Sequence, residues 1–281
     1  MTNNVVITGG AGGMGLATAE LMGLDHRVVL ADLGQERVDA AVAKLRALGI
    51  DASGRVCDIT DRGAVDALFD EAEAGGHVRA VVHSAGVSPQ MGEAAFIVRI
   101  NALGTVHITE SFLRRAAEGD ALVNVSSIAG HMSPGFLQPT GAFKLALRDD
   151  LPRFERKLVG STRILPKKSR AGAAYSTSKA FVLWYTREMA AAFGAKGARI
   201  VSVSPGSFDT EMGRLEEKSG SAKLIEYAAI KRFGRPEEVA AVLAFAASEA
   251  PGYLTGTDIL VDGGTKAGLN TRALLSMMRG D

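Results

Sequence analysis

The chain has 281 residues, of which 47% are hydrophobic and 22% are charged, and its formal net charge is +1. A chain of this length and composition buries a full hydrophobic core, which excludes an intrinsically disordered protein. The near-neutral charge gives no global electrostatic reason to bind nucleic acid or a membrane surface, so small molecules and further copies of the chain are the expected partners.

Cysteine usage and the start of the chain bear on the cellular compartment. Cys57 is the only cysteine, so no internal disulfide can form. The first four residues lead directly into a strand-like apolar run, without a charged and then apolar leader. No apolar stretch approaches the roughly 18 residues of a membrane span. We therefore expect a soluble protein of the cytoplasm.

Short β-branched runs alternate with longer segments of helical periodicity along the chain. The expected strands cover residues 5–8, 27–31, 54–57, 78–83, 121–126, 199–204 and 258–261. The expected helices cover residues 16–22, 37–48, 65–72, 96–115, 173–193 and 236–248. Such alternation is typical of βαβ units, and near-continuous apolar strands are typical of a sheet covered on both faces. The sequence therefore predicts an α/β fold, a doubly wound, seven-stranded parallel Rossmann sheet with helices on both faces.

Residues 131 to about 171 interrupt this alternation. Between residues 144 and 170 there are nine lysines and arginines but only three acidic residues. Five apolar residues in this segment follow helical spacing: Phe143, Leu147, Leu151, Phe154 and Leu158. Asp150 shortly before Pro152 is typical of a helix start. We expect a helical insertion with two short helices before the following long helix.

The insertion lies within one catalytic domain, residues 1–264, which a tail at residues 265–281 follows. Its positive charge would attract a carboxylate or a CoA thioester, and its apolar stripe would line a pocket for an alicyclic substrate. The alternative is an amphipathic helix pair that buries the stripe on the body of the protein and leaves its cations in solvent.

A glycine-rich segment follows the first expected strand and leads into the first helix. Its sequence is Thr8-Gly9-Gly10-Ala11-Gly12-Gly13-Met14-Gly15. Glycine lets the backbone turn tightly and approach a pyrophosphate, whose charge the N-terminus of the next helix stabilises. The alternative is an ordinary tight turn.

Asp32 ends the second expected strand 17 positions after Gly15. This is near the spacing at which a carboxylate reaches the adenosine ribose hydroxyls. Its charge would repel the 2′-phosphate of NADP, so NAD is the expected cofactor. Arg37 is the nearby cation that would favour NADP, and a simple cap of the turn at Leu33 is the alternative role of Asp32.

Tyr175 and Lys179 lie four positions apart in the expected helix 173–193, and therefore on one face of it. The lysine ammonium is expected to hold the tyrosine pKa below its usual value of about 10, so that the phenol exchanges protons near neutral pH. Ser127 follows another strand, 48 positions before Tyr175. This separation is too long for a simple loop.

Several motifs in a fixed order resemble the short-chain dehydrogenase/reductase family. The residues that carry the resemblance are Thr8, Gly9, Gly13, Gly15, Ser84-Ala85-Gly86, Asn101, Ser127, Tyr175, Lys179 and Pro205-Gly206. The resemblance implies an NAD-dependent oxidoreductase that transfers a hydride between nicotinamide and a secondary alcohol or ketone.

The resemblance also implies a catalytic set of four residues. Tyr175 would exchange a proton with the substrate oxygen, and Lys179 would stabilise the phenolate and bind the nicotinamide ribose. Ser127 would hydrogen-bond the substrate oxygen, and Asn101 would help to hold a water that links Lys179 to solvent. The neighbouring Ser126 leaves the register open; Ser127 is favoured because the family's serine directly precedes an apolar residue.

The implied cofactor site draws on segments along the whole chain, and no metal is expected. Its residues are Gly9, Gly13, Met14, Gly15, Asp32, Leu33, Asp58, Ile59, Ser84, Ala85, Gly86, Tyr175, Lys179, Pro205, Gly206, Phe208 and Thr210. Asp58 and Ile59 would contact the adenine, and Phe208 and Thr210 would hold the nicotinamide amide. His83, before the segment that passes behind the ribose, is expected to be a buried histidine with an ordinary hydrogen bond.

Two departures from the family pattern bear on substrate and assembly. The segment between Ser127 and Tyr175 is longer than usual, and the link from Gly86 to Asn101 is shorter. More narrowly, the chain resembles the bacterial 3α-hydroxysteroid dehydrogenase/carbonyl reductase branch, which implies a bulky steroid-like or alicyclic substrate. A homo-oligomer is expected, either a dimer or a tetramer, with the insertion favouring the dimer.

Other functions are compatible with the same motifs. One is a catalytically silent NAD-binding sensor or regulator, and another is a reductase of a hydroxyacyl-CoA type substrate. Dehydratase or epimerase chemistry on the same fold is a further alternative. The presence of Ser127, Tyr175 and Lys179 together favours simple oxidation and reduction.

Overall fold

The computed structural model describes residues 3–132, 135–216 and 222–269. Within them, seven parallel strands form one sheet in the order β3-β2-β1-β4-β5-β6-β7. The strands are β1 (Asn4–Thr8), β2 (Arg27–Asp32), β3 (Ala52–Val56), β4 (Val78–His83), β5 (Ala121–Val125), β6 (Arg199–Pro205) and β7 (Asp258–Val261). This confirms the predicted doubly wound parallel sheet, in which the strand order reverses beside β1.

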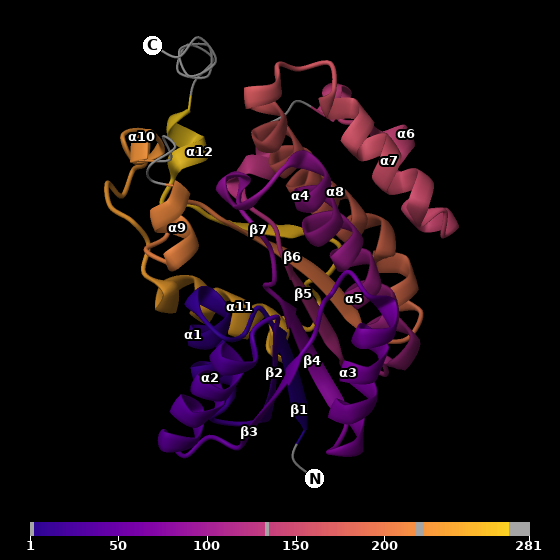
Figure 1. The fold of residues 1–281 in the computed structure, drawn as a ribbon. Coiled ribbons are helices and arrows are strands. Elements are labelled where there is room, and N and C mark those ends of the chain that lie inside the picture. Colours follow the sequence, from indigo (N-terminus) through magenta and orange to yellow (C-terminus); the bar gives the residue numbers. More distant parts are fainter. Residues whose placement is uncertain (1–2, 133–134, 217–221, 270–281) are drawn as a thin grey trace.

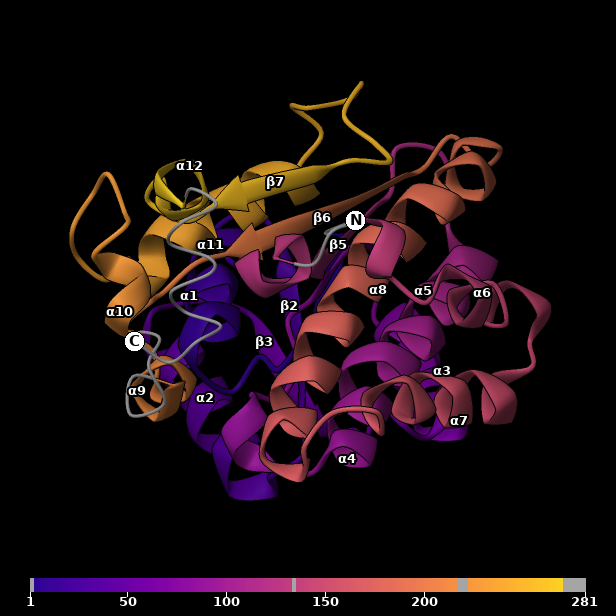
Figure 2. The same cartoon turned by 90° about the horizontal axis from the view of Figure 1, so that it is seen from above.

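Helices cover both faces of the sheet (Figure 1). One layer comprises α1 (Gly13–Met22), α2 (Gln35–Ala47) and α11 (Pro236–Ala247), and the other comprises α3 (Arg62–Ala74), α5 (Gly104–Arg115) and α8 (Arg170–Gly194). Shorter helices α9 (Glu211–Glu216), α10 (Ala222–Ile225) and α12 (Thr265–Gly268) lie toward the carboxyl ends of the strands in Figure 1, and Figure 2 shows them together on one side of the molecule. The rest of the predicted tail, residues 270–281, lies outside the described residues.

The helix predicted over residues 96–115 consists of three joined pieces. These are α4 (Ala94–Val98), a single wide π turn (Arg99–Leu103) and α5. Asn101 lies in the π turn, where its amide donates to the carbonyl of Val87 and accepts from the N–H of the same residue, both at 2.9 Å. The backbone of Val87, 14 residues before Asn101, is thus hydrogen-bonded to the side chain in the π turn.

The insertion folds into α6 (Thr140–Phe143) and α7 (Leu151–Thr162), with short 3₁₀ turns around them. The Asp150 carboxylate accepts from the N–H of Arg153 at 3.3 Å and caps α7, as the sequence indicated. The 12 residues of α7 make it longer than the short helix expected.

The apolar stripe of the insertion packs on α8. Phe143, Phe154 and Leu158 are fully buried, and the ring of Phe154 lies 4.7 Å from that of Phe181 between centroids. The inclusion of Leu147 in this stripe was wrong, because Leu147 sits in a 3₁₀ turn and its side chain is exposed. The stripe therefore belongs to the core.

No helix among the described residues combines the length and the apolarity needed to cross a bilayer.

Candidate functional site

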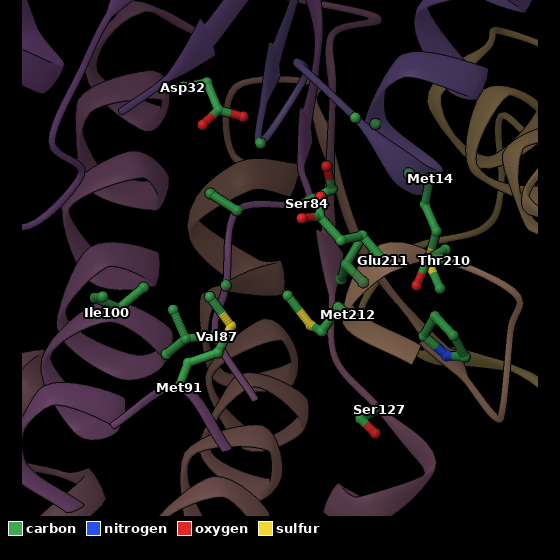
Figure 3. Close-up of a pocket in the computed structure, with 18 of the residues that line it drawn as sticks. Met14, Asp32, Ser84, Val87, Met91, Ile100, Ser127, Thr210, Glu211 and Met212 are labelled. Atoms are coloured by element: carbon green, nitrogen blue, oxygen red, sulfur yellow. The ribbon is translucent and has the colours of Figure 1, made fainter. Parts of the chain in front are cut away.

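A cavity of about 510 Å³ opens at the carboxyl ends of the strands (Figure 3). All of the predicted cofactor residues line it, as do Ser127, Tyr175 and Lys179. Asn101 does not line the cavity; it lies behind Val87, to which its side chain is bonded. Ligands of doubly wound sheets bind at this edge, outside the carboxyl ends of the strands.

The glycine-rich turn is closely packed against the next strand connection. Gly9 has a φ of 65° and Gly13 a φ of 52°, a region that side chains disfavour. A Cβ on Gly15 would lie 2.4 Å from the carbonyl oxygen of Gly9 and 2.8 Å from Oγ of Ser84. These positions therefore require glycine for the turn itself and for its contact with the β4 end.

The N-terminus of α1 faces the same cavity. Gly12 precedes the helix without a side-chain cap, and the first turn contains no acidic residue. The first N–H groups of a helix without such a cap form a partial positive charge that suits an anion. The turn thus fits the pyrophosphate of a dinucleotide.

Asp32 lies at the end of β2 with its carboxylate held by two backbone groups. Oδ1 accepts from the N–H of Leu33 at 2.8 Å, and Oδ2 accepts from that of Ala11 at 3.2 Å. Each oxygen retains a lone pair for a further donor, such as a ribose hydroxyl. The guanidinium of Arg37 lies nearby, since its Nη2 would be 3.1 Å from a Cβ on Gly12.

The residues after β3 form a short polar turn. The carboxylate of Asp58 accepts from the N–H and the hydroxyl of Thr60, both at 2.8 Å, and Asp58 is exposed. Ile59 is buried, and its side chain would be 2.5 Å from a Cβ on Gly104. Both residues line the cavity at the side of β2 and β3.

The two neighbouring serines after β5 point in different directions. Oγ of Ser126 donates to the carbonyl of Lys179 at 2.8 Å. Oγ of Ser127 accepts from the N–H of Ala129 at 3.1 Å, and its side chain lies in the cavity (Figure 3). The hydroxyl of Ser126 is therefore bonded to the backbone of α8, which favours Ser127 as the residue that meets a substrate.

A close backbone contact brings Ser127 to the helix of Tyr175. Ser127 precedes the 3₁₀ turn η3 (Ile128–His131), and Gly130 in this turn lies against α8. A Cβ on Gly130 would be 2.8 Å from the carbonyl carbon of Lys179. The turn thus packs directly on the backbone of α8, at the lysine that follows Tyr175 by one helical turn.

Lys179 is almost fully buried beside Tyr175. Its Nζ lies 5.9 Å from the centre of the Tyr175 ring and donates to the carbonyl of Val125 at 3.0 Å. A Cβ on Gly86 would be 3.4 Å from this Nζ and 3.1 Å from Oδ1 of Asn101. The ammonium thus lies between the phenol and the strand ends.

His83 is buried at the end of β4, as expected. Its Nδ1 lies 2.7 Å from Oγ1 of Thr8, and its Nε2 lies 3.2 Å from Oγ1 of Thr105. Burial, together with the charge of Lys179, lowers the pKa of His83 to about 3. His83 is therefore neutral at physiological pH and shares its hydrogen bonds with two threonines.

The segment after β6 forms a further part of the cavity wall. Thr210 is buried, and its Oγ1 accepts from the N–H of Gly213 at 2.9 Å. Phe208 is buried against Gly234, whose Cβ would lie 2.4 Å from the phenyl ring. Pro205 and Gly206 lead into this segment at the end of β6.

Sequence reasoning missed several apolar residues that line the cavity. They are Val87, Met91, Ile100, Met212 and Leu215. Met91 and Met212 extend toward each other from the segment after β4 and from α9 (Figure 3). Met212 lies two residues after Thr210, and this position was the signal by which it could have been found. No such signal marked Met91, which lies 121 residues earlier.

Comparisons with known proteins agree with this site. Residues 3–150 match the family model described as short chain dehydrogenase, and residues 157–266 match the one described as enoyl-(acyl carrier protein) reductase. The chain is 32% identical over 274 residues to the cis-4-hydroxycyclohexanecarboxylate dehydrogenase of Sinomonas cyclohexanicum, over 93% of this chain and 96% of that protein. It is 29% identical over 274 residues to the short-chain dehydrogenase/reductase bsc3 of Alternaria brassicicola, over 96% and 98% of the two chains.

Solved structures show the same fold. An actinorhodin polyketide ketoreductase with NADPH superimposes with a TM-score of 0.74 at 22% identity, over 94% of this chain and 97% of that one. A short-chain dehydrogenase of Burkholderia cenocepacia J2315 in complex with NADP gives 0.73 at 24% identity, over 94% and 98%. The chain belongs to the short-chain dehydrogenase/reductase family, a family of oxidoreductases that bind a nicotinamide cofactor.

Proposed function

We propose that this protein is an NAD-dependent oxidoreductase that interconverts a bulky secondary alcohol and its ketone, with an alicyclic ring as the preferred substrate class. The observation that carries the proposal is one cavity in which Ser127, Tyr175 and Lys179 stand beside apolar walls that include Met91 and Met212. The polar residues suit a reacting oxygen, and the apolar walls suit a hydrocarbon ring.

The chemistry assigns a separate task to each polar side chain. The nicotinamide, when bound, accepts or returns the hydride. Tyr175 as phenolate takes the alcohol proton, and in the opposite direction the phenol donates it to the carbonyl oxygen. The ammonium of Lys179, 5.9 Å from the ring centre, stabilises the phenolate. Ser127 donates a hydrogen bond to the substrate oxygen, where negative charge develops.

Asn101 contributes from behind the cavity. Its side chain fixes the backbone of Val87, and Oδ1 lies close to Gly86 and the buried Lys179. We assign to it the support of this segment and of a water that connects Lys179 with solvent.

The preference for NAD over NADP rests on Asp32. Its carboxylate stands at the end of β2, and a 2′-phosphate placed there would meet a negative charge whose lone pairs suit free hydroxyls. The guanidinium of Arg37 beside Gly12 is the feature that opposes this preference. The variant Asp32→Ser tests it: we expect weaker binding of NAD and a gain in turnover with NADP, whereas wild type that turns over faster with NADP would contradict the assignment.

An alicyclic substrate class is supported by the walls of the cavity and by a relative. The walls of the cavity are mostly uncharged. Among the described lining residues, the charged ones are Asp32, Arg37, Asp58, Lys179 and Glu211, and all the others are apolar or uncharged polar residues. The relative from Sinomonas cyclohexanicum is named for a hydroxycyclohexane carboxylate, a secondary alcohol on a six-membered ring. A steroid ring system presents the same local chemistry and is the larger member of this class.

The insertion does not favour a CoA thioester as substrate. None of the described residues between 131 and 171 lines the cavity, and the helix α7, which carries three of the nine cations counted in the insertion, packs on α4 and α8. A catalytically silent NAD-binding regulator is less well supported, because such a protein would not need Ser127, Tyr175 and Lys179 together in one cavity.

We also propose a homodimer rather than a tetramer. Family members commonly assemble through the tyrosine-bearing helix and the helix before it, and α7 occupies part of that surface in this chain. A light-scattering mass of two chains is expected, and a mass of one or four chains would contradict the proposal.

The test of the function follows NADH absorbance over a panel of alcohols and ketones. The panel contains cyclohexanols with and without a carboxylate, steroids, linear secondary alcohols, sugars and hydroxyacyl-CoA esters. We expect turnover on the cyclic alcohols and its loss in Tyr175→Phe. The matched control is Tyr253→Phe, because Tyr253 is fully exposed and does not line the cavity. Undiminished turnover in Tyr175→Phe would reject the mechanism, and turnover confined to acyl-CoA esters would reject the substrate class.

A further inference from the structure

His131 ends the 3₁₀ turn that Ser127 begins, but it does not line the cavity. Its imidazole contacts side chains of β6 and β7. Nε2 lies 2.9 Å from Oδ2 of Asp258 on β7 and 3.2 Å from Oγ of Ser204 on β6. The turn that carries Ser127 is thus tied to the ends of two strands.

The partners of this histidine assign its hydrogen atoms. Asp258 is an acceptor, and it already receives Oγ of Ser202 at 2.6 Å and Oγ of Ser204 at 2.9 Å. Nε2 of His131 therefore donates to Asp258. Nδ1 is then an acceptor, and it lies 3.3 Å from the ammonium of Lys266 on α12. Each ring nitrogen has a matching partner.

The same contacts reach the segment beside the expected nicotinamide end of the cavity. Ser204 directly precedes Pro205 and Gly206, which line the cavity. Gly206 packs on Asp262, since a Cβ there would be 2.8 Å from the Asp262 Cα, and the Asp262 carboxylate accepts from the N–H of Lys266 at 2.8 Å. His131 thus connects the turn of Ser127 with the loop that follows β6.

The turn needs such an anchor because of where the chain goes next. After His131 the chain enters the insertion instead of proceeding directly to α8. Two of the contacts that hold the turn are those of Gly130 with the backbone of α8 and of His131 with β6 and β7. The first fixes the turn relative to Tyr175, and the second fixes it relative to the loop after β6.

We propose that His131 is a positioning residue that sets the separation between the Ser127 hydroxyl and the cofactor loop at residues 205–210. The inference rests on the proposed oxidoreductase function, since Ser127 then acts on the substrate oxygen. Loss of the imidazole is expected to affect turnover more than cofactor binding, because the hydrogen-bond partners of His131 are Ser204, Asp258 and Lys266 and include neither the glycine turn nor Asp32. Misplacement of a catalytic hydroxyl by about 1 Å lowers rates by one to two orders of magnitude.

The test compares His131→Leu with His131→Gln, whose amide nitrogen can replace Nε2. The matched control is His77→Leu: Nε2 of His77 lies 2.8 Å from Oδ1 of Asp120, and His77 directly precedes β4, at the amino ends of the strands and not at the carboxyl ends where the cavity lies. For each variant we measure kcat, KM, NADH binding by fluorescence and Tm. We expect His131→Leu to lower kcat about tenfold or more, with NADH affinity within about twofold, and His131→Gln to recover most of the rate.

The outcomes separate this role from a purely structural one. His77→Leu should lower Tm but leave kcat within about twofold, and an equal loss of kcat in His77→Leu and His131→Leu at equal Tm would overturn the proposal. Hydrogen exchange of residues 126–132 gives a readout without turnover: exchange should rise in His131→Leu and return toward wild type in His131→Gln. Unchanged exchange in His131→Leu also overturns it, whereas a wild type that turns over no alcohol rejects the proposed function alone.

Discussion

Protonation of His83 is predicted to make folding stability depend on pH. The side chain is buried between Thr8 and Thr105, and its folded pKa is about 3, compared with 6.5 for a free histidine. Between these two values the unfolded chain binds a proton that the native chain does not bind. Stability therefore rises with pH in this window, and falls as pH drops below about 6.5.

The magnitude follows from the separation of the two pKa values. A pH of 5 is 1.5 units below the pKa of 6.5 of the unfolded histidine, which is therefore protonated, while the native histidine is still neutral. Each unit corresponds to about 1.4 kcal/mol, so His83 costs about 2 kcal/mol of stability at pH 5 relative to pH 7.5. Burial is the larger cause of the low pKa and the Lys179 charge the smaller, so Lys179→Met should raise the native pKa while leaving most of the cost at pH 5 in place.

The assay is urea unfolding of wild type and His83→Asn at pH 7.5 and pH 5.0. The substitution shortens the side chain and has a cost of its own, but that cost is nearly independent of pH. We expect the stability advantage of wild type over His83→Asn to shrink by about 2 kcal/mol between the two pH values. The control is His77→Asn, whose side chain is 41% exposed. Equal differences at both pH values would refute the reasoning.

Two further predictions concern the glycine turn and the insertion. Gly15→Ala should weaken NADH binding more than tenfold by fluorescence titration, because its Cβ would lie 2.4 Å from a backbone oxygen, whereas Gly172→Ala has open space and should bind normally. Phe154→Ala should lower the free energy of unfolding by about 3–5 kcal/mol in urea while leaving KM unchanged, because Phe154 is fully buried away from the cavity. Leu147→Ala should have little effect on either, and a changed KM in Phe154→Ala would place α7 in the substrate site.

The sheet and the glycine turn were predictable because their signals are local. Apolar runs mark the strands, and the glycines with Asp32 follow the first two strands at fixed spacing. The third strand begins two residues earlier than expected because Ala52 pairs with Val28 of β2, a contact that composition does not encode. The residue composition of a segment predicts that a strand is present, whereas the neighbouring strand with which it pairs determines where the strand begins and ends.

Two features of the site could not be predicted because distant segments create them. The π turn at Asn101 depends on hydrogen bonds to the backbone of Val87, which only the folded chain brings close. The facing pair of Met91 and Met212 depends on α9 lying over the segment after β4. Met91 lies in no pattern whose spacing implies a ligand.

The long interval between Ser127 and Tyr175 sets no distance between the two side chains. Ser127 is placed by β5 and by the contacts of its turn with α8, β6 and β7, and Tyr175 by its position on α8. The insertion leaves from one fixed end and returns to the other, and closure of a longer loop adds little entropy cost. The apolar side chains of the insertion that pack on Phe181 of α8, such as Phe154, offset that entropy cost. An extra helical segment therefore fits between Ser127 and Tyr175 while both residues still line one cavity.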